Sequence, residues 1–423
     1  MLQMWFIVIT LLSSLNLVIG NYRVSISTVL LIIIGSIMIF KKPCFSFFSG
    51  KVLLALFIYM LFSGFTAIIG PCTDTFTKMV FSAPLFIFLI FIAMEIGWNA
   101  NEHEWLQLQK PATWLLAICI ASFMIEMIFP DYFPSQAKYR DEGRYSGLLF
   151  SEPSHVALSM FPCIVVLMTT KVKHSQRNGI LALFLLFLFS YSSTLIILTT
   201  CWLLYTLLMQ KQTGQQTRVA IIISFCFLIV AVASFGQYFT QTVERAVGIM
   251  DITSTANISS MIYWQGWQDA WSNLLRTHGI GLGFNMMGCN PLPDSPIRDI
   301  FDKYMPVWAT YLNIHDGSFL ASKIVSELGI IGISFFILVI WWWLKFERCI
   351  SKNNSLGMNN FALPVQAGLM FYFIIISFTR STSYFQGTLL IWVLAATGAA
   401  KWYYVQNRKR HHGFQPPTSP DQI

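Results

Sequence analysis

Charged residues are scarce in this sequence. Only 11% of the 423 residues are Asp, Glu, Lys or Arg, against about 25% in a typical soluble domain. Hydrophobic residues make up 55% of the chain, and the mean hydropathy is +0.61. A water-soluble protein could not bury so much apolar surface. The composition therefore excludes an ordinary soluble enzyme and predicts a membrane protein.

Motifs of metal and redox chemistry are also missing. The eight cysteines form no CxxC pair and no His/Cys spacing typical of zinc sites. Cys72 and Cys289 fall in segments predicted to lie outside the cell, where an oxidising compartment would allow a disulfide between them. The remaining cysteines of interest lie inside apolar runs, as small packed residues: Cys119, Cys163, Cys201 and Cys226.

Several other signals are absent. The N-terminus has no basic start and no A-x-A-like cleavage site, so residues 4–20 are predicted to be a first span and not a cleaved signal peptide. No internal repeat or low-complexity block is found. The glycine-rich GIGLGF follows no predicted strand, which argues against a nucleotide site. Asp294, Asp299 and Asp302 are irregularly spaced, so no metal site is expected.

Apolar runs are what the sequence has in abundance. Many are about 17–20 residues long, the length with which a helix crosses a bilayer core. One run is longer, and as a single helix it would measure about 46 Å, although polar residues interrupt it near Ser190–Thr194. The predicted spans are 4–20, 24–40, 52–70, 79–97, 112–129, 154–170, 179–209, 219–236, 319–344, 361–379 and 384–400.

The placement of basic residues decides how the long run is divided. If 179–209 forms two short spans, sixteen Lys and Arg residues fall on one side of the membrane and six on the short connectors of the other. This asymmetry follows the positive-inside rule, and a single span would abolish it. The net charge of +8 is therefore a topology signal, and no nucleic-acid partner is expected.

The predicted fold is all-α, a polytopic membrane protein of about twelve transmembrane helices with both termini in the cytoplasm. Residues 1–404 form one membrane domain with outer segments 130–153 and 237–318, the second being one large non-cytoplasmic loop. Short helices rich in Trp are expected there, on or dipping into the membrane. Residues 405–423 are predicted to be a disordered, basic cytoplasmic tail.

Ionisable residues gather at four places on the predicted outer side. Such groups at a membrane face are costly and are usually kept for function or pairing. The four groups are Arg140, Arg144, Glu152 and His155; Arg245, Arg276 and His278; His315, Asp316, Lys323 and Glu327; and Arg380.

These side chains suit one kind of chemistry. Arginine offers planar, bidentate donors to phosphates, and a histidine can remove a proton from a sugar hydroxyl near neutral pH. Arginines can also stabilise a departing diphosphate without a metal ion. Together these residues favour glycosyl transfer from a lipid-linked diphosphate.

Each residue also has a purely structural explanation, and these alternatives stay open. Arg140 can be a solvated loop charge, as His278 can be a plain loop residue. Glu152 before Pro153 can favour a helix N-terminus electrostatically. Lys323 and Glu327 are spaced i,i+4 and can simply pair. Arg380 can anchor a span at the interface.

Three segments resemble a known family. RYSGLLFSEPSHVA (144–157), YWQGWQDAWSNLLRTHGIGLGF (263–284) and NIHDGSFLASKIVSELGIIG (313–332) resemble motifs of the Wzy-type O-antigen and capsule polymerases. The layout is similar as well, with about twelve spans and one large outer loop. The likeness covers most of the chain as architecture but only about fifty residues as motif.

The resemblance implies a metal-independent glycosyltransferase without a cofactor in the bacterial inner membrane. It would polymerise undecaprenyl-diphosphate-linked oligosaccharide units on the periplasmic side, beside a flippase and a chain-length-regulating co-polymerase. By the same resemblance, His315 would be the general base, Arg144 and Arg380 would grip diphosphate, and Glu152 would position Arg144 or the acceptor. The substrate-binding set would add Arg276, Arg245 and His155.

The sequence departs from the family in two places. The family often has an arginine shortly before the Trp of its aromatic helix, where this chain has Ser259–Tyr263; Arg245 or Arg276 could compensate. The His315–Asp316 pair also differs from the commoner His-Asn form.

Two alternative functions remain. An O-antigen ligase shares this architecture but transfers the glycan to a lipid A core. A twelve-span secondary transporter belongs to a different class, but transporters usually have two similar halves and charges near the midplane.

Overall fold

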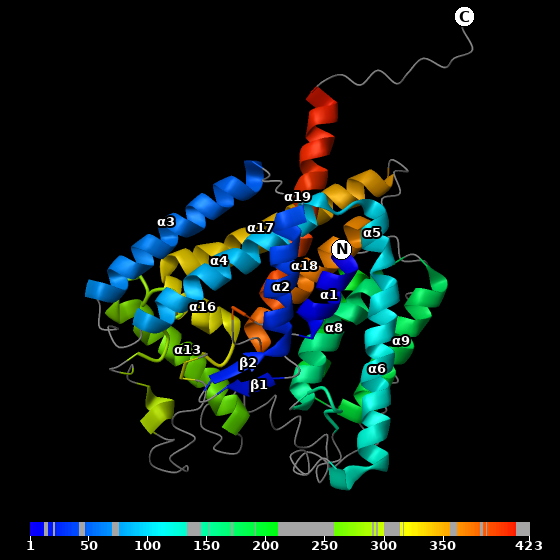
Figure 1. Ribbon diagram of the computed structural model, residues 1–423, viewed down its shortest axis with the longest axis horizontal. Coiled ribbons are helices and arrows are strands. Elements are labelled where there is room, and N and C mark those ends of the chain that lie inside the picture. The colour runs from blue at the N-terminus through cyan, green and yellow to red at the C-terminus, as the bar shows by residue number, and fades with distance from the viewer. Residues whose placement is uncertain are drawn as a thin grey trace, which may run out of the picture.

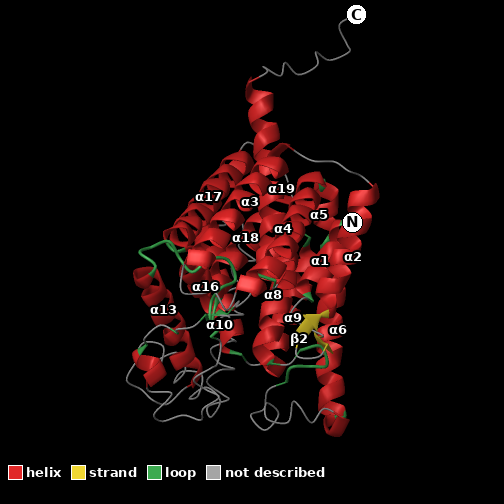
Figure 2. Ribbon diagram, turned by 60° about the vertical axis from the view of Figure 1, so that its left-hand side comes forward, coloured by secondary structure: helices red, strands yellow, loops and turns green. Residues whose placement is uncertain are grey.

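The computed structural model is a bundle of helices with one short β-hairpin (Figures 1 and 2). It describes residues 1–11, 16–19, 22–41, 47–69, 76–132, 145–150, 152–170, 172–190, 192–209, 258–289, 292, 295–299, 314–315, 317–355, 362–380, 384–385 and 387–411.

The first half of the chain contributes eight named α-helices besides the hairpin. They are α1 (Leu2–Thr10), α2 (Ile26–Lys41), α3 (Phe47–Ile69), α4 (Phe76–Asn99), α5 (Glu102–Gln107), α6 (Gln109–Ile128), α8 (Pro153–Thr169) and α9 (Lys173–Ser190). A 3₁₀ turn, η2 (Pro130–Tyr132), follows α6. The described helices that follow are α10 (Ser193–Met209), α13 (Ile258–Arg276), α16 (Leu320–Leu328), α17 (Ile330–Ser355), α18 (Ala362–Thr379) and α19 (Gly387–His411).

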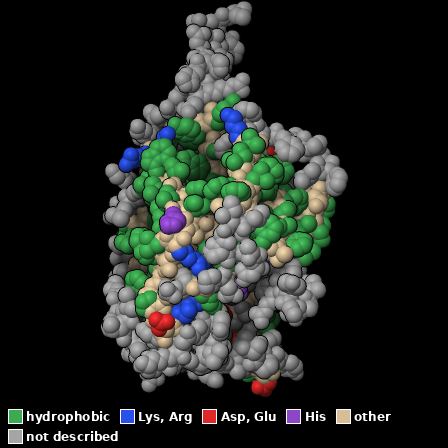
Figure 3. Space-filling model, turned by 90° about the vertical axis from the view of Figure 1, so that its left-hand side faces the viewer, with side chains coloured by type: hydrophobic (Ala, Val, Ile, Leu, Met, Phe, Trp, Pro, Cys, Tyr) green, Lys and Arg blue, Asp and Glu red, His purple; other side chains and the backbone are tan. Residues whose placement is uncertain are grey.

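The helices indicate a membrane protein. Within the described part of the chain, five segments are long and apolar enough to cross a bilayer: Ser49–Thr66, Phe76–Asn99, Glu102–Ile128, Ile330–Ser351 and Ala362–Thr379. Large apolar side chains are exposed along these helices, and Phe81 and Trp114 are 80% and 70% exposed. Figure 3 shows hydrophobic side chains across the middle of one face, with Lys and Arg side chains above and below them. Such a surface suits lipid contact.

The first predicted span is wrong in its second half. Helix α1 ends at Thr10, and strands β1 (Asn16–Ile19) and β2 (Tyr22–Ser25) form an antiparallel hairpin in which Ile19 pairs with Tyr22. The pairing leaves a two-residue link, Gly20–Asn21, between β-favouring residues, which is a hairpin signal. The apolar content of 4–20 obscured that signal.

Two long apolar runs are each broken into two helices. The run 179–209 is confirmed to break, because α9 ends at Ser190 and α10 begins at Ser193. The predicted span 319–344 also divides, at Gly329 between α16 and α17. Gly329 has a φ of 59°, and a Cβ there would lie 2.0 Å from the carbonyl oxygen of Gly279. Only glycine permits this approach.

Other predictions of topology are tested less completely. The predicted span 219–236 lies outside the part of the chain that the structure describes, and the total of twelve spans stays a prediction. Helix α19 continues to His411, beyond the predicted start of the basic tail at residue 405.

The helices pack closely where glycine allows it. A Cβ at Gly97 of α4 would lie 2.3 Å from the carbonyl oxygen of Leu394 in α19. At Gly368 of α18 it would meet Val165 of α8 at 2.8 Å. Helix α18 therefore packs inside the bundle. The residue that follows its last turn is Arg380, one of the predicted site residues.

The two ends of the bundle differ in character. Helix α19 and the C-terminus leave at one end, whereas α13 and the β-hairpin lie toward the other (Figures 1 and 2). We refer to these as the tail end and the loop end.

Candidate functional site

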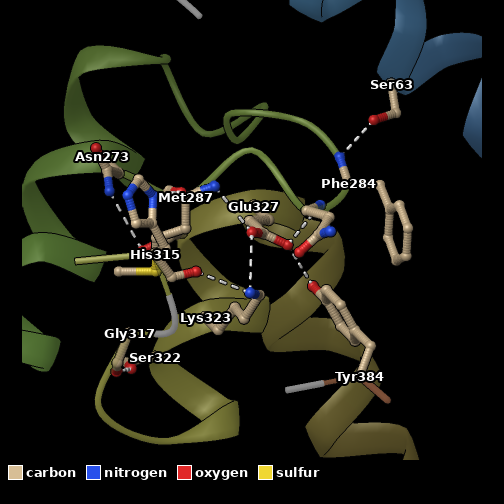
Figure 4. Close-up of polar contacts among 12 residues, drawn as sticks. Ser63, Asn273, Phe284, Met287, His315, Gly317, Ser322, Lys323, Glu327 and Tyr384 are labelled. Carbon is tan, nitrogen blue, oxygen red and sulfur yellow. Dashed lines mark hydrogen bonds and ion pairs between the residues drawn. The ribbon is translucent and has the colours of Figure 1, made fainter. Parts of the chain in front are cut away.

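The best-organised polar cluster at the loop end is built around the carboxylate of Glu327. This side chain is on α16 and is 1% exposed. Its Oε2 accepts hydrogen bonds from the backbone N–H of Asn285 at 2.8 Å and from the hydroxyl of Tyr384 at 2.7 Å. Its Oε1 accepts from the backbone N–H of Met287 at 2.9 Å (Figure 4). Both carboxylate oxygens thus accept hydrogen bonds, from donors on two segments of the chain.

Lys323 connects this carboxylate to His315. Its Nζ lies 3.9 Å from Oε1 of Glu327 and donates to the backbone carbonyl of His315 at 2.9 Å (Figure 4). The lysine is 1% exposed, and its Nζ lies 5.5 Å from the centre of the Tyr384 ring. The sequence-based alternative of a simple i,i+4 pair is therefore incomplete, because the lysine also holds the main chain at His315.

The ring of His315 is exposed. Its Nδ1 lies 3.4 Å from the carbonyl oxygen of Met287, which can only accept a hydrogen bond. The proton is therefore assigned to Nδ1, leaving the lone pair on Nε2. A Cβ at Gly288 would lie 2.3 Å from Nδ1, so the imidazole rests against a position that only glycine can fill.

The GIGLGF segment forms the base of this cluster. Backbone N–H groups of Leu282 and Gly283 donate to the carbonyls of Ser326 and Glu327, both at 3.0 Å. Gly281 has a φ of 90°, and a Cβ there would lie 2.4 Å from the carbonyl oxygen of Glu327. The glycines thus let a loop pack against the end of α16, which gives the motif a structural role and no phosphate cradle.

Helix α13 joins the two sides of the site through aromatic contacts. The ring of Trp267 lies 4.9 Å from Phe319, just before α16, and 6.3 Å from Phe378, near the end of α18. Tyr263 stacks on Phe319 at 4.6 Å. The helix that carries the predicted aromatic motif therefore contacts both the His315 segment and the helix that leads to Arg380.

Helix α13 buries several polar side chains and exposes two large apolar ones. Gln265, Asp269 and Asn273 are 2%, 5% and 1% exposed, whereas Trp271 and Leu275 are 62% and 59% exposed. This is the reverse of a helix on a soluble protein. It suits the expected position at a membrane interface, where the apolar side would meet lipid.

Asp269 holds a neighbouring segment against α13. Nη2 of Arg298 donates to both carboxylate oxygens of Asp269, at 2.9 and 2.8 Å. Burial raises the pKa of the Asp269 carboxyl, and the positive charge of Arg298 opposes this effect only in part. The pair was not among the sequence-predicted site residues and has a structural role.

Arg276 lies on the last turn of α13. Its Nη2 is 3.6 Å from Sγ of Cys289, close to the segment that holds Glu327 and His315. Cys289 is disulfide-bonded, to a cysteine outside the described residues; its pairing with Cys72 stays a prediction. Of the residues predicted to bind substrate, Arg276 is thus placed near His315.

A second cluster lies where α8 begins and α18 ends. Arg380 Nη2 lies 2.7 Å from Oε2 of Glu152, with the two side chains 32% and 37% exposed. Ser154 donates to the same oxygen at 3.0 Å. The charges of Glu152 and Arg380 both act on the imidazole of His155. The structure therefore brings Arg380 together with two predicted site residues, Glu152 and His155, that precede it by more than 200 positions in sequence.

The segment before Glu152 is anchored into the bundle. The N–H of Gly147 donates to Oε2 of Glu126 at 2.7 Å, and the N–H of Tyr145 donates to the carbonyl of Phe189 at 2.7 Å. Glu126 is 0% exposed and lies in the last turn of the apolar helix α6. Arg144 precedes this anchored segment directly but lies outside the described residues, as do Arg140, Arg245 and Asp316.

Sequence reasoning missed Tyr384 and Glu126. Nothing in the sequence around Tyr384 signals its role, because only folding brings it to Glu327. Glu126 did carry a signal, since an acidic residue inside a predicted span usually has a functional or pairing reason. Among the described residues, no group of three or more His, Cys, Asp or Glu could hold a metal ion.

No family model, no curated protein and no solved structure matches this chain.

Proposed function

We propose that this protein is a membrane glycosyltransferase that polymerises lipid-diphosphate-linked oligosaccharide units on the outer side of a bacterial inner membrane. The observation that carries the proposal is that an exposed imidazole, His315, and a partly exposed guanidinium, Arg380, both lie at the loop end of an apolar bundle. These are the two chemical functions that transfer from a lipid diphosphate requires.

The reaction follows from these groups. Nε2 of His315 takes the proton of a hydroxyl on the acceptor sugar, and the oxygen attacks the anomeric carbon of the donor chain. The bond from that carbon to the diphosphate breaks, and its electrons leave with the undecaprenyl diphosphate. Arg380, with Arg144 and Arg276 as further phosphate ligands, stabilises the developing negative charge.

Glu152 keeps Arg380 in place before the substrate binds. The two charges lie 2.7 Å apart and are about one-third exposed, so incoming phosphate oxygens can compete for the guanidinium. His155 stands next to this pair and completes the polar start of α8. In this proposal Glu152 positions Arg380, whereas the sequence resemblance suggested Arg144 or the acceptor.

Two observations support an outer location. Cys289, close to Arg276, is disulfide-bonded, and disulfides persist in oxidising compartments. The Lys- and Arg-rich end of α19 leaves from the opposite end of the bundle (Figure 1), as the positive-inside rule requires for a cytoplasmic tail.

Replacing His315 and Arg380 separately by alanine tests the proposal in cells from which the native gene has been deleted. Each change removes a group that acts in the transition state, so we expect transfer to fall about 10²–10³-fold. Long surface polysaccharide should be replaced by a single attached repeat unit on gels. Lys345→Met, which alters an exposed side chain at the tail end, is the matched control and should leave chain length unchanged.

The gel pattern separates the alternatives, provided that each variant reaches the membrane. Complete loss of attached glycan would favour a ligase. Wild-type chain lengths in both alanine variants would exclude the proposed site.

A further inference from the structure

We propose that Glu327 is a positioning residue that sets the spacing between His315 and Arg380. This inference rests on the proposed function, because it concerns how the base and the phosphate-binding group of that reaction are held. Glu327 itself touches no substrate in this scheme. It acts through the three segments whose donors meet at its carboxylate.

The first segment is the loop that supports the imidazole. Glu327 binds the N–H groups of Asn285 and Met287 at 2.8 and 2.9 Å. The carbonyl of Met287 in turn faces Nδ1 of His315 at 3.4 Å. Moving the carboxylate would therefore move the acceptor that orients the ring and leaves Nε2 free.

The second segment is the main chain of His315. Lys323 lies 3.9 Å from Glu327 and donates to the carbonyl of His315 at 2.9 Å. The lysine thus links the carboxylate to the base by two consecutive polar contacts. His315 is held from its backbone and from its ring, and both contacts lead back to Glu327.

The third segment carries Arg380. Tyr384 follows Arg380 by four residues and donates to Glu327 at 2.7 Å. Its ring stacks on Phe284 at 4.8 Å and lies 5.6 Å from Phe86. The aromatic contacts hold the ring of Tyr384 in place, and its hydrogen bond sets the distance between this segment and the carboxylate of Glu327.

Simple stabilisation explains this arrangement poorly. A buried ion pair often contributes little net stability, because removing two charges from water offsets their attraction. Lys323 and Glu327 are both 1% exposed, and together they bind parts of three loops. The arrangement instead connects one carboxylate, that of Glu327, both to the proposed base His315 and to the segment that follows Arg380.

Tyr384→Phe is the sharpest test, because it removes one hydroxyl and keeps the stacked ring. We expect kcat to fall on the order of tenfold, as for loss of a hydrogen bond to a charged group, with KM little changed. The assay uses purified protein in nanodiscs with lipid-diphosphate-linked repeat units isolated from cells that lack this gene.

Tyr205→Phe is the matched control. Tyr205 is also buried and also donates to a buried glutamate, Glu347, but it does so between α10 and α17. The kcat of the Tyr205→Phe variant should equal that of the wild type. Lys323→Arg keeps the positive charge and should recover much of the activity that Lys323→Met loses.

Hydrogen exchange gives a readout that needs no activity. In Glu327→Gln, an NH2 donor replaces one of the two carboxylate oxygens, so the backbone amide that faces it, that of Asn285 or of Met287, should exchange at least tenfold faster than in the wild type. In Tyr384→Phe these amides should stay protected while kcat falls. That combination supports positioning, since a merely structural loss would affect both.

The outcomes are separable. Wild-type kcat in Tyr384→Phe, or unchanged exchange in Glu327→Gln, would overturn the positioning role even if His315→Ala is inactive. A wild-type protein that transfers no sugar would instead overturn the proposed function, and the exchange data would still decide whether Glu327 anchors the loop.

Discussion

Two buried glutamate–tyrosine pairs stand at opposite ends of the α16–α17 region. At the loop end, Tyr384 donates to Glu327; toward the tail end, Tyr205 donates to Glu347. All four side chains are buried, with exposed fractions of 4%, 1%, 3% and 8% in that order. The chemical groups are the same, but their surroundings differ.

The difference lies in what else each carboxylate binds. Glu347 is on a long helix and meets Tyr205 on another, where backbone N–H groups are already used within the helices. Glu327 is near the end of the short helix α16 and faces a loop whose N–H groups at Asn285 and Met287 need an acceptor. The carboxylate of Glu327 can therefore hold the backbone of a loop in place, whereas that of Glu347 mainly joins two side chains.

Replacing each glutamate by alanine should give the largest contrast. Glu327→Ala leaves Lys323 buried without its charge partner and removes the acceptor of two amides, a loss of about 3–5 kcal/mol. Glu347→Ala leaves the Tyr205 hydroxyl without its acceptor, at about 1–3 kcal/mol. Tyr205 keeps its stacking on Phe371 at 4.5 Å.

Thermal unfolding of both variants in the same detergent measures this contrast. Equal shifts in melting temperature would show that the loop-end carboxylate organises no more structure than the one between helices.

Alanine substitutions at two glycines compare the loop end with the bundle centre, with a smaller expected loss of stability. In Gly281→Ala, the new Cβ would lie 2.4 Å from a backbone oxygen of Glu327, at a φ of 90°. Backbone cannot yield easily, and strain of this kind costs about 1–3 kcal/mol before the clash is counted. Gly368→Ala at the bundle centre meets side chains, at 2.8 Å for Val165, and overpacking there costs about 1–3 kcal/mol.

The two glycine variants should also differ in activity. Gly281→Ala displaces the carbonyl of Glu327 and should lower sugar transfer in proportion to that displacement, whereas Gly368→Ala should leave transfer per folded molecule unchanged. Parallel losses of transfer per folded molecule would remove the distinction between the two ends.

The same distinction explains what the sequence could predict. Helices α4, α6 and α18 follow from long apolar runs, and the break before Ser193 follows from a polar stretch and the charge asymmetry. The hairpin at Asn16–Ser25 was hidden because its strands are as apolar as a span. The periodicity and composition of a sequence indicate which residues face lipid or the core, and they predict helices better than apolar strands.

The candidate site was predictable only in part. Glu152 and Arg380 were each singled out, but their ion pair joins the ends of α8 and α18, which only tertiary packing brings together. Lys323 and Glu327 were seen as an i,i+4 pair, which is a local pattern. Their links to His315 and Tyr384 depend on loop conformations that positive-φ glycines permit, and one sequence does not reveal which segments those loops meet.

Two buried amides provide the smallest and last test of the comparison. Gln265 of α13 and Gln366 of α18 are 2% and 3% exposed. Among the residues that the structure describes, both side-chain polar atoms of Gln265 lack a hydrogen-bond partner, as does Oε1 of Gln366. A buried amide without a partner costs about 1–3 kcal/mol, and leucine has a similar volume.

Gln265→Leu should therefore raise the melting temperature by more than Gln366→Leu, corresponding to a gain of about 1 kcal/mol. Sugar transfer should change in neither variant, because neither amide contacts His315 or Arg380 through any hydrogen bond among the described residues. If Gln265→Leu instead lowers transfer while Gln366→Leu does not, the polar side of α13 takes part in the reaction. In that case the loop end would differ from the helical core in binding sugar as well as in the way its backbone is held.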